Sequence, residues 1–331
     1  MSMRIVDHTE GRVPGPGLYR MPAALYHADP APGPSLSSSI ARAIISETPR
    51  HAHAKHPRLT PQTEDSKNRK MDLGSVAHEI LTGEGRGIHV ITATNKAGEA
   101  VETYATKAAQ EERDEALAAG LTPVLYCDLL KAERMVEAVR SRLAETPETR
   151  GAFEQGAGET SLVWQDRLGL WGRAQLDWRG PEPHLVWDLK TTSAGLSDRA
   201  IATKIAEGLD IQEHWYRRGL TRLVPDLMGR VRMRFVFVET VEPFECRVIE
   251  LSGEQQWLGE RKAITAAVLF RECLRTGRWP GYAAGISRVE APAWPAAQWE
   301  AREAADPLFR EFGTALVLAH STAAPDQEIA A

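Results

Sequence analysis

Two short segments near the middle of the chain alternate polar and apolar residues, a pattern that predicts β-strands. They are 174–178 and 184–190, joined by a short turn. Because strand side chains alternate between faces, Asp188 and Lys190 share one face of the second strand. Asp177 lies near the end of the first strand. The pattern therefore brings two carboxylates and an ammonium group to neighbouring strands.

The remaining periodicity predicts an α/β protein. Helices are predicted at 35–46, 71–82, 100–119, 128–145, 197–207, 211–224 and 253–277, and strands at 88–93, 159–164, 170–178, 184–190, 231–240 and 244–251. Residues 50–69 are polar and charged, which favours a loop. Helices, then a three-strand meander, then helices and two more strands predict a mixed central β-sheet flanked by helices.

The distribution of Pro and Gly suggests three regions. Residues 1–34 are rich in both and weakly periodic, so we expect an extended lead-in. Residues 35–285 hold the core, with a helical elaboration at 86–150. Residues 286–331 are expected to form a partly disordered tail.

Composition narrows the class of protein. The chain has 331 residues, of which 43% are hydrophobic, and no apolar run approaches membrane-spanning length. We therefore expect a cytoplasmic protein with no membrane partner. The three cysteines show no CxxC spacing, which argues against a disulfide framework, a zinc knuckle and an iron–sulfur cluster.

The charge balance alone does not indicate a nucleic-acid partner. Lys plus Arg total 40 against 45 Asp plus Glu, a formal charge of −5. A DNA channel needs only a local positive stripe, however, and cations gather at 50–70 and at 217–234. Taken singly, each stripe also fits a solvated surface.

The carboxylates and lysine suit metal-dependent phosphodiester hydrolysis. Asp177 and Asp188 offer the oxygen ligands that a hard divalent cation prefers. Lys190 can steady an attacking water or the charge developing on a phosphate. The alternative is a pair of solvated strand carboxylates with a cross-strand salt bridge, but strand interiors disfavour Asp.

The ordered set formed by His78, Glu159, Asp177, Asp188-x-Lys190 and Gln212-xxx-Tyr216 resembles the PD-(D/E)XK nuclease superfamily. Within it, the chain resembles the RecE-type exonucleases (exonuclease VIII) of phages and prophages. Three further stretches fit that family, namely 36–39, 73–79 and 278–282. The resemblance covers about residues 35–285 and implies a restriction-endonuclease-like core.

The resemblance implies roles for individual residues. Asp177, Asp188, His78 and the backbone carbonyl of Leu189 would bind the metal, Lys190 would orient the attacking water, and Glu159 would lie near the metals. Glu159 fits an exposed strand end equally well. Without the resemblance, His78 would be taken as a surface residue.

Further residues would contact the substrate. Gln212 and Tyr216 lie four apart on one helix face, which in the family borders the active site, although ordinary packing explains Tyr216 as well. Ser37, Ser39 and Arg42 could meet a terminal phosphate, or Ser37 could simply cap its helix. Arg173 is placed near the site because it shares a strand face with Asp177.

The family acts with Mg²⁺ (Mn²⁺ is an alternative) on double-stranded DNA from the 5′ end and leaves 3′ single strands for recombination. Its members assemble as ring-like homo-oligomers and hand the strand to a single-strand annealing protein. The resemblance thus implies a phage- or prophage-encoded enzyme that binds DNA ends. The alternatives are a structure-specific endonuclease of the same superfamily, a DNA-end binding protein without turnover, and a metal-dependent phosphatase.

Overall fold

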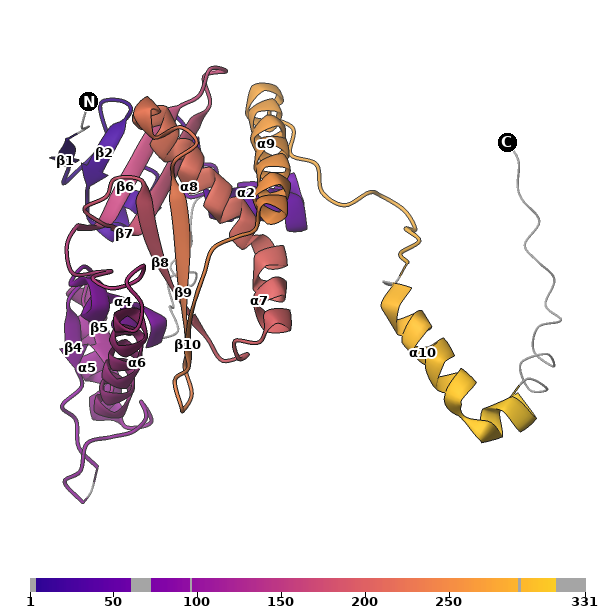
Figure 1. Ribbon diagram of the computed structural model, residues 1–331. Helices are drawn as coiled ribbons and strands as arrows, with labels where there is room; N and C mark the ends of the chain where they lie inside the picture. The colour runs from indigo at the N-terminus through magenta and orange to yellow at the C-terminus, as the bar shows by residue number, and fades with distance from the viewer. Residues whose placement is uncertain (1–3, 61–72, 96, 291–292, 314–331) are drawn as a thin grey trace. The chain divides into compact units, whose positions relative to one another are not determined.

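A computed structural model describes residues 4–60, 73–95, 97–290 and 293–313 of the chain. The chain divides into two compact units, Met1–Gly281 and Tyr282–Ala331. The first unit is built on a long mixed sheet with helices packed against it, drawn in Figure 1. The predicted fold class, a mixed sheet flanked by helices, is thereby confirmed.

The strands of the main sheet run in the order β1-β2-β6-β7-β8-β9-β10, and β3 pairs with β7. Their bounds are β1 Ile5–Asp7, β2 Gly17–Arg20, β3 Ser35–Leu36, β6 Ala157–Gln165, β7 Trp171–Arg179, β8 Leu185–Thr192, β9 Arg232–Glu239 and β10 Cys246–Ile249. The meander β6-β7-β8 is antiparallel, whereas β8 and β9 run parallel because helices connect them. Strands β4 Ile88–Val90 and β5 Thr122–Val124 form a separate parallel pair.

The helices of the first unit are α1 Ala23–His27, α2 Ser38–Ser46, α3 Pro49–Lys55, α4 Leu73–Thr82, α5 Lys107–Ala118, α6 Tyr126–Ala144, α7 Asp198–Lys204, α8 Asp210–Leu223 and α9 Gly253–Thr276, with shorter turns η2 Ile205–Leu209 and η3 Pro225–Leu227. Helices α2, α8 and α9 pack together beside the sheet (Figure 1). Their main core includes Trp164, Trp215 and Phe270. Helices α4 and α6 pack together over a second core that includes Met135 and Val236.

Helix α9 shows why several predicted boundaries hold. Ser252 accepts a hydrogen bond from the Gln255 amide and so caps the first turn. Gly277 ends the helix with φ of 68°, a left-handed conformation that glycine adopts without steric cost. The prediction of a helix over 253–277 is confirmed to within one residue.

Two sequence-based expectations were wrong. The first 34 residues are not merely an extended lead-in, because β2 pairs with β6 and β1 extends the same sheet. The predicted loop at 50–69 begins as helix α3, since Pro49 occupies the first helical turn, where its missing N–H costs nothing, and Thr48 caps it. Residues 61–69 of that loop lie outside the described part of the chain.

The second unit contains helix α10 Ala293–Ala305 and a short turn η4 Phe309–Gly313. Both lie within the tail at 286–331 that was predicted to be partly disordered, of which residues 291–292 and 314–331 lie outside the described residues. Among the helices described, none is both long enough and apolar enough to cross a membrane.

Candidate active site

The candidate site lies where strands β7 and β8 part. Their ladder joins only Trp178 to Trp187 and Arg179 to Val186, so the strands separate immediately beyond, at Asp177 and Asp188. The backbone N–H of Leu189 donates to Oδ2 of Asp177 at 3.0 Å. If the β7–β8 ladder continued, the Leu189 N–H would donate to the backbone of β7. The Asp177 carboxylate accepts from it instead.

Asp188 is the most deeply buried acid of the site, with no exposed surface. Gln212 on α8 donates to its Oδ1 at 2.6 Å, and Lys190 forms an ion pair with its Oδ2. Burial, and then the nearby charge of Asp177, raise the pKa of Asp188 to about 7, while Lys190 opposes the shift. The charge of each of these three groups, Asp177, Asp188 and Lys190, therefore affects the protonation of the others.

The two carboxylates also shift the pKa of Lys190. Burial alone would lower the pKa of Lys190, but the carboxylates of Asp188 and Asp177 outweigh burial and raise it. Lys190 therefore stays a cation at neutral pH. Its position against Asp188 matches the sequence prediction that the two share a strand face.

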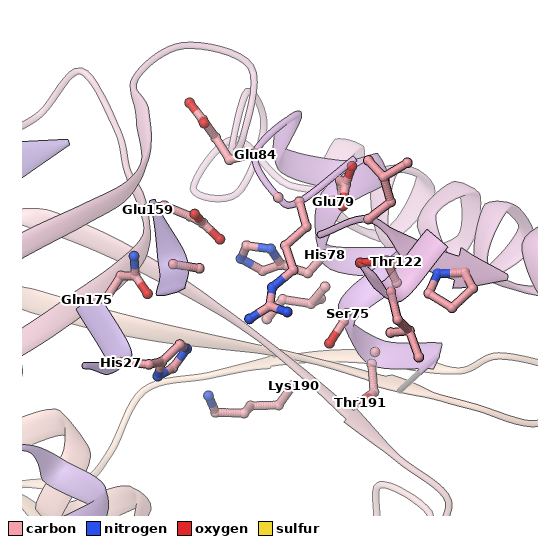
Figure 2. Close-up of a pocket in the computed structure, with 18 of the residues that line it drawn as sticks. His27, Ser75, His78, Glu79, Glu84, Thr122, Glu159, Gln175, Lys190 and Thr191 are labelled. Atoms are coloured by element: carbon pink, nitrogen blue, oxygen red, sulfur yellow. The ribbon is translucent and has the colours of Figure 1, made fainter. Parts of the chain in front are cut away.

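His78 reaches the site from α4. Its Nε2 lies 3.8 Å from Oδ2 of Asp177. In Figure 2 the Glu159 carboxylate and the His78 ring point toward one another across the same space. Burial raises the pKa of Glu159, and the nearby His78 opposes that shift. The structure thus brings His78, Glu159, Asp177, Asp188 and Lys190 together, as predicted.

Glu159 has an unusual backbone. The β6–β7 ladder pairs Gly158 with Trp178 and Thr160 with Leu176, and skips Glu159 between them. Its φ is 42°, in the left-handed region that residues with a Cβ rarely adopt. Such strain persists where the surrounding structure enforces it, and it often marks functional sites.

A cavity of about 850 Å³ opens beside these groups (Figure 2). His78, Glu159 and Lys190 line it. Arg86, between α4 and β4, and Arg113, on α5, line it as well. Sequence reasoning missed both arginines, because no periodic pattern links them to the site. It also missed Gln175, although Gln175 lies two residues before Asp177 on β7 and so falls on the same predicted strand face.

The residues present fit a divalent cation in part. Over the described residues, no three His, Cys, Asp or Glu side chains are already arranged as a closed metal site. Oδ2 of Asp188, however, is buried, and its partner is the ammonium group of Lys190. A buried carboxylate close to a second carboxylate is the kind of donor set that hard cations prefer. Asp177, Asp188 and the carbonyl of Leu189 are thus the residues that would hold the ion, with His78 next to them.

Tyr216 and Arg42 border this centre. The pKa of Tyr216 is raised well above its usual value by burial, and then by Tyr26, Asp188 and other nearby negative groups. Arg42 on α2 is exposed, and its side chain passes Gly208, where an added Cβ would lie 2.6 Å from Arg42 Cδ. Gly208 has φ of 119°, so both its conformation and this close approach call for glycine.

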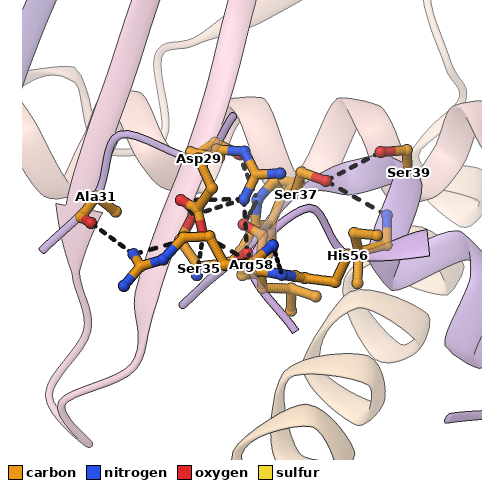
Figure 3. A network of polar contacts seen from close by, with 11 residues as sticks. Asp29, Ala31, Ser35, Ser37, Ser39, His56 and Arg58 are labelled. Atoms are coloured by element: carbon orange, nitrogen blue, oxygen red, sulfur yellow. Dashed lines mark hydrogen bonds and ion pairs between the residues drawn. The ribbon is translucent and has the colours of Figure 1, made fainter. Parts of the chain in front are cut away.

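Ser37 and Ser39 mark the start of α2. Ser37 caps the helix by accepting from the Ile40 amide at 3.4 Å, and its Oγ lies 2.9 Å from that of Ser39 (Figure 3). Ser37 is buried, whereas Ser39 is exposed. The capping interpretation of Ser37 thus has direct support, and a phosphate contact at Ser39 stays a prediction.

Arg173 does not face the cavity. It is buried, donates to the carbonyl and Oγ of Ser35 at 2.8 and 2.7 Å, and forms an ion pair with Asp29 at 3.2 Å. Oδ2 of Asp29 also lies 3.8 Å from Nη1 of Arg58 and 3.5 Å from Nε2 of His56 in the same buried network (Figure 3). The prediction that Arg173 binds substrate therefore needs correction, because these contacts tie β7 to the N-terminal segment.

Comparison with known proteins shows the family to which this chain belongs. The model of a PDDEXK-like domain of unknown function (DUF3799) matches residues 37–291. The crystal structure of a candidate exonuclease from Eubacterium rectale is similar with a TM-score of 0.47 and 10% identity, covering 78% of this chain and 90% of that one. That likeness is too low to assign an activity. A search of curated proteins found no significant match. The family model includes strands β6 to β10 of the sheet, with Asp177, Asp188 and Lys190. The chain belongs to this PDDEXK-like family, within the PD-(D/E)XK nuclease superfamily.

Proposed function

We propose that this protein is a metal-dependent deoxyribonuclease that hydrolyses phosphodiester bonds with Mg²⁺, or alternatively Mn²⁺. One observation carries the proposal most strongly. Asp188 is fully buried, with Gln212 on one oxygen and Lys190 against the other, at the point where β8 separates from Asp177 on β7. A carboxylate pair with an adjacent ammonium has little structural purpose there, because buried charges cost stability.

The proposed chemistry divides among these residues. A divalent ion held by Asp177 and Asp188 would polarise the scissile phosphate and lower the pKa of bound water. Gln212 fixes the orientation of Asp188 through its 2.6 Å hydrogen bond. Lys190 places a positive charge beside the reacting phosphate and the attacking water. No covalent intermediate is needed, since water is the nucleophile.

The charges around the cavity support a nucleic-acid substrate. Arg86 and Arg113 line the cavity, and Arg42, midway along α2, is exposed and close enough for its charge to act on Lys190. Guanidinium groups bind phosphate oxygens well because they offer paired donors. A small phosphate ester would leave some of these cations without a role, which favours DNA over a phosphatase substrate.

The finer proposal is an exonuclease that degrades double-stranded DNA from the 5′ end. It rests on the motif set shared with the RecE-type enzymes, including Gln212 and Tyr216, which here lie next to Asp188. On the same basis we propose a ring-like homo-oligomer, a single-strand annealing partner and a phage or prophage setting in the cytoplasm.

End-labelled DNA tests this proposal. A linear duplex labelled separately at its 5′ and 3′ ends is incubated with the protein and Mg²⁺, beside a covalently closed circle. Early release of 5′-labelled mononucleotide with a spared circle is the expected result. A cut circle would indicate a structure-specific endonuclease instead. DNA binding without cleavage in either Mg²⁺ or Mn²⁺ would leave only an end-binding protein.

A further inference from the structure

Helix α8 presents different residues on opposite faces. Gln212 and Tyr216, four residues apart, face the candidate active site. At 100° per residue, His214, Arg218 and Thr221 fall on the other side of the helix. There they line a second cavity of about 580 Å³, which shares no lining residue with the first.

This second cavity is strongly cationic. Four arginines line it, Arg167, Arg217, Arg218 and Arg222, against the single carboxylate of Glu260. Arg217 is paired with Glu213 at 3.1 Å, and Arg218 lies 3.7 Å from Asp166. Over the described residues, Arg167 and Arg222 form no ion pair. A cluster of guanidinium groups, two of which have no paired carboxylate, is typical of a phosphate-binding site.

Two buried polar atoms at this cavity have no partner. Nε2 of His214 and Nε of Arg218 are buried and form no hydrogen bond with any described residue. Burial, and then the charges of Arg218 and Arg217, lower the pKa of His214 to about 4, so the ring is neutral at pH 7. Buried polar atoms are costly when unpaired, so their presence points to a ligand that pairs with them.

The cavity also has an apolar edge. Trp257, at the start of α9, is 56% exposed, and Met228 is 71% exposed, yet both line this cavity. Arg261 lies over the Trp257 ring, 5.6 Å from its centroid. An exposed indole beside phosphate-binding cations suits a nucleobase, because bases stack on aromatic side chains without regard to sequence.

We propose that this cavity is a second nucleotide-binding site, in which Arg167, Arg218 and Arg222 bind a phosphate and Trp257 contacts the base. The ligand is a nucleoside phosphate, either as one unit of a single DNA strand or as a free mononucleotide. This second site goes beyond the proposed function, because none of its residues belongs to the candidate active site.

The test is equilibrium binding in EDTA, where no hydrolysis occurs. The probes are a fluorescent single-stranded oligonucleotide, a deoxynucleoside monophosphate, the matching nucleoside without phosphate, and inorganic phosphate. The test variant is the double substitution Arg167→Gln with Arg222→Gln, which leaves no carboxylate unpaired. The matched control is Arg199→Gln with Arg230→Gln, two exposed arginines outside the cavity that carry the same charge.

The expected loss is about tenfold in affinity for each guanidinium removed, against less than about twofold for the control pair. Trp257→Ala should weaken nucleotide binding and leave inorganic phosphate binding unchanged, whereas Trp257→Phe should retain both. Binding of the oligonucleotide but not the monophosphate identifies a strand site, and binding of both identifies a free nucleotide. Equal binding by the test and control variants would overturn the proposal.

This result is separable from the proposed function. Hydrolysis is assayed independently with Mg²⁺. A protein that cleaves no DNA but loses nucleotide binding in the cavity variant would refute the nuclease and keep this site. Normal cleavage by the wild type, with nucleotide binding unchanged in the cavity variant, would support the nuclease and refute this second site.

Discussion

Gln212 donates a 2.6 Å hydrogen bond to Oδ1 of Asp188 and so joins helix α8 to strand β8 at the buried centre of the site. Lys190 occupies the other carboxylate oxygen. With both oxygens engaged, the plane of the Asp188 carboxylate is fixed. An arrangement of this kind orients a metal ligand before the metal arrives.

Replacing Gln212 by Ala should therefore slow hydrolysis by about 10- to 100-fold, because Asp188 loses the donor that orients it. The effect should be seen as a higher Mg²⁺ concentration for half-maximal rate, with little change in the denaturant midpoint. A Mg²⁺ titration of the initial rate measures it. An unchanged Mg²⁺ dependence would show that Gln212 only packs against the sheet.

The buried network around His56 predicts a specific pH dependence of stability. Burial, and then the charge of Arg173, lower the pKa of His56 to about 4. Between pH 6.5 and 4 the unfolded chain takes up a proton at this residue and the folded chain does not, so stability falls as pH falls through that window. The difference amounts to about 3 kcal/mol at most.

His56→Gln should remove this dependence. The variant should be less stable than the wild type at pH 7, because the contacts of His56 with Ser35 and Asp29 are altered. Between pH 6.5 and 4 its free energy of unfolding should change less steeply. Urea unfolding at half-unit pH steps measures both slopes, and parallel slopes would argue against a neutral His56 in the folded protein.

A close approach of α8 and α9 predicts an intolerant glycine. A Cβ added at Gly259 would lie 2.2 Å from the backbone oxygen of Asp210. Gly259→Ala should therefore cost about 1–3 kcal/mol of stability, although alanine normally favours a helix. Gly253→Ala in the same helix meets no atom within 4 Å and should change stability by less than about 0.5 kcal/mol. Equal unfolding midpoints for the two variants would contradict this packing.

The strands around the site were predictable because local alternation determines which side chains share a face. Asp188 and Lys190 followed from that rule alone, and the structure pairs them. The same rule puts Arg173 on the face of Asp177, but it does not show which partner Arg173 contacts. Its partner Ser35 lies 138 positions away, in a segment whose sequence gave no sign of joining the sheet. Long-range pairing of that kind leaves no trace in local periodicity.

Other features of the site arise only from tertiary structure. The left-handed backbone of Glu159 is held by its neighbours, since glutamate has no intrinsic preference for it. The cations Arg86 and Arg113 come from a segment with no regular link to the meander. The charged stripe after residue 217 divides in the structure: Arg217, Arg218 and Arg222 line a cavity, whereas Arg232 and Arg234 pair with Glu250.

The most direct test of the account is cleavage of a linear DNA duplex with Mg²⁺ by the wild type and by Asp188→Asn and Lys190→Ala, with EDTA as a further control. The account predicts cleavage by the wild type alone, abolished by EDTA and reduced at least about 1,000-fold in both variants, with unfolding midpoints showing that the variants are folded. Undiminished cleavage by either variant, or by the wild type in EDTA, would contradict it.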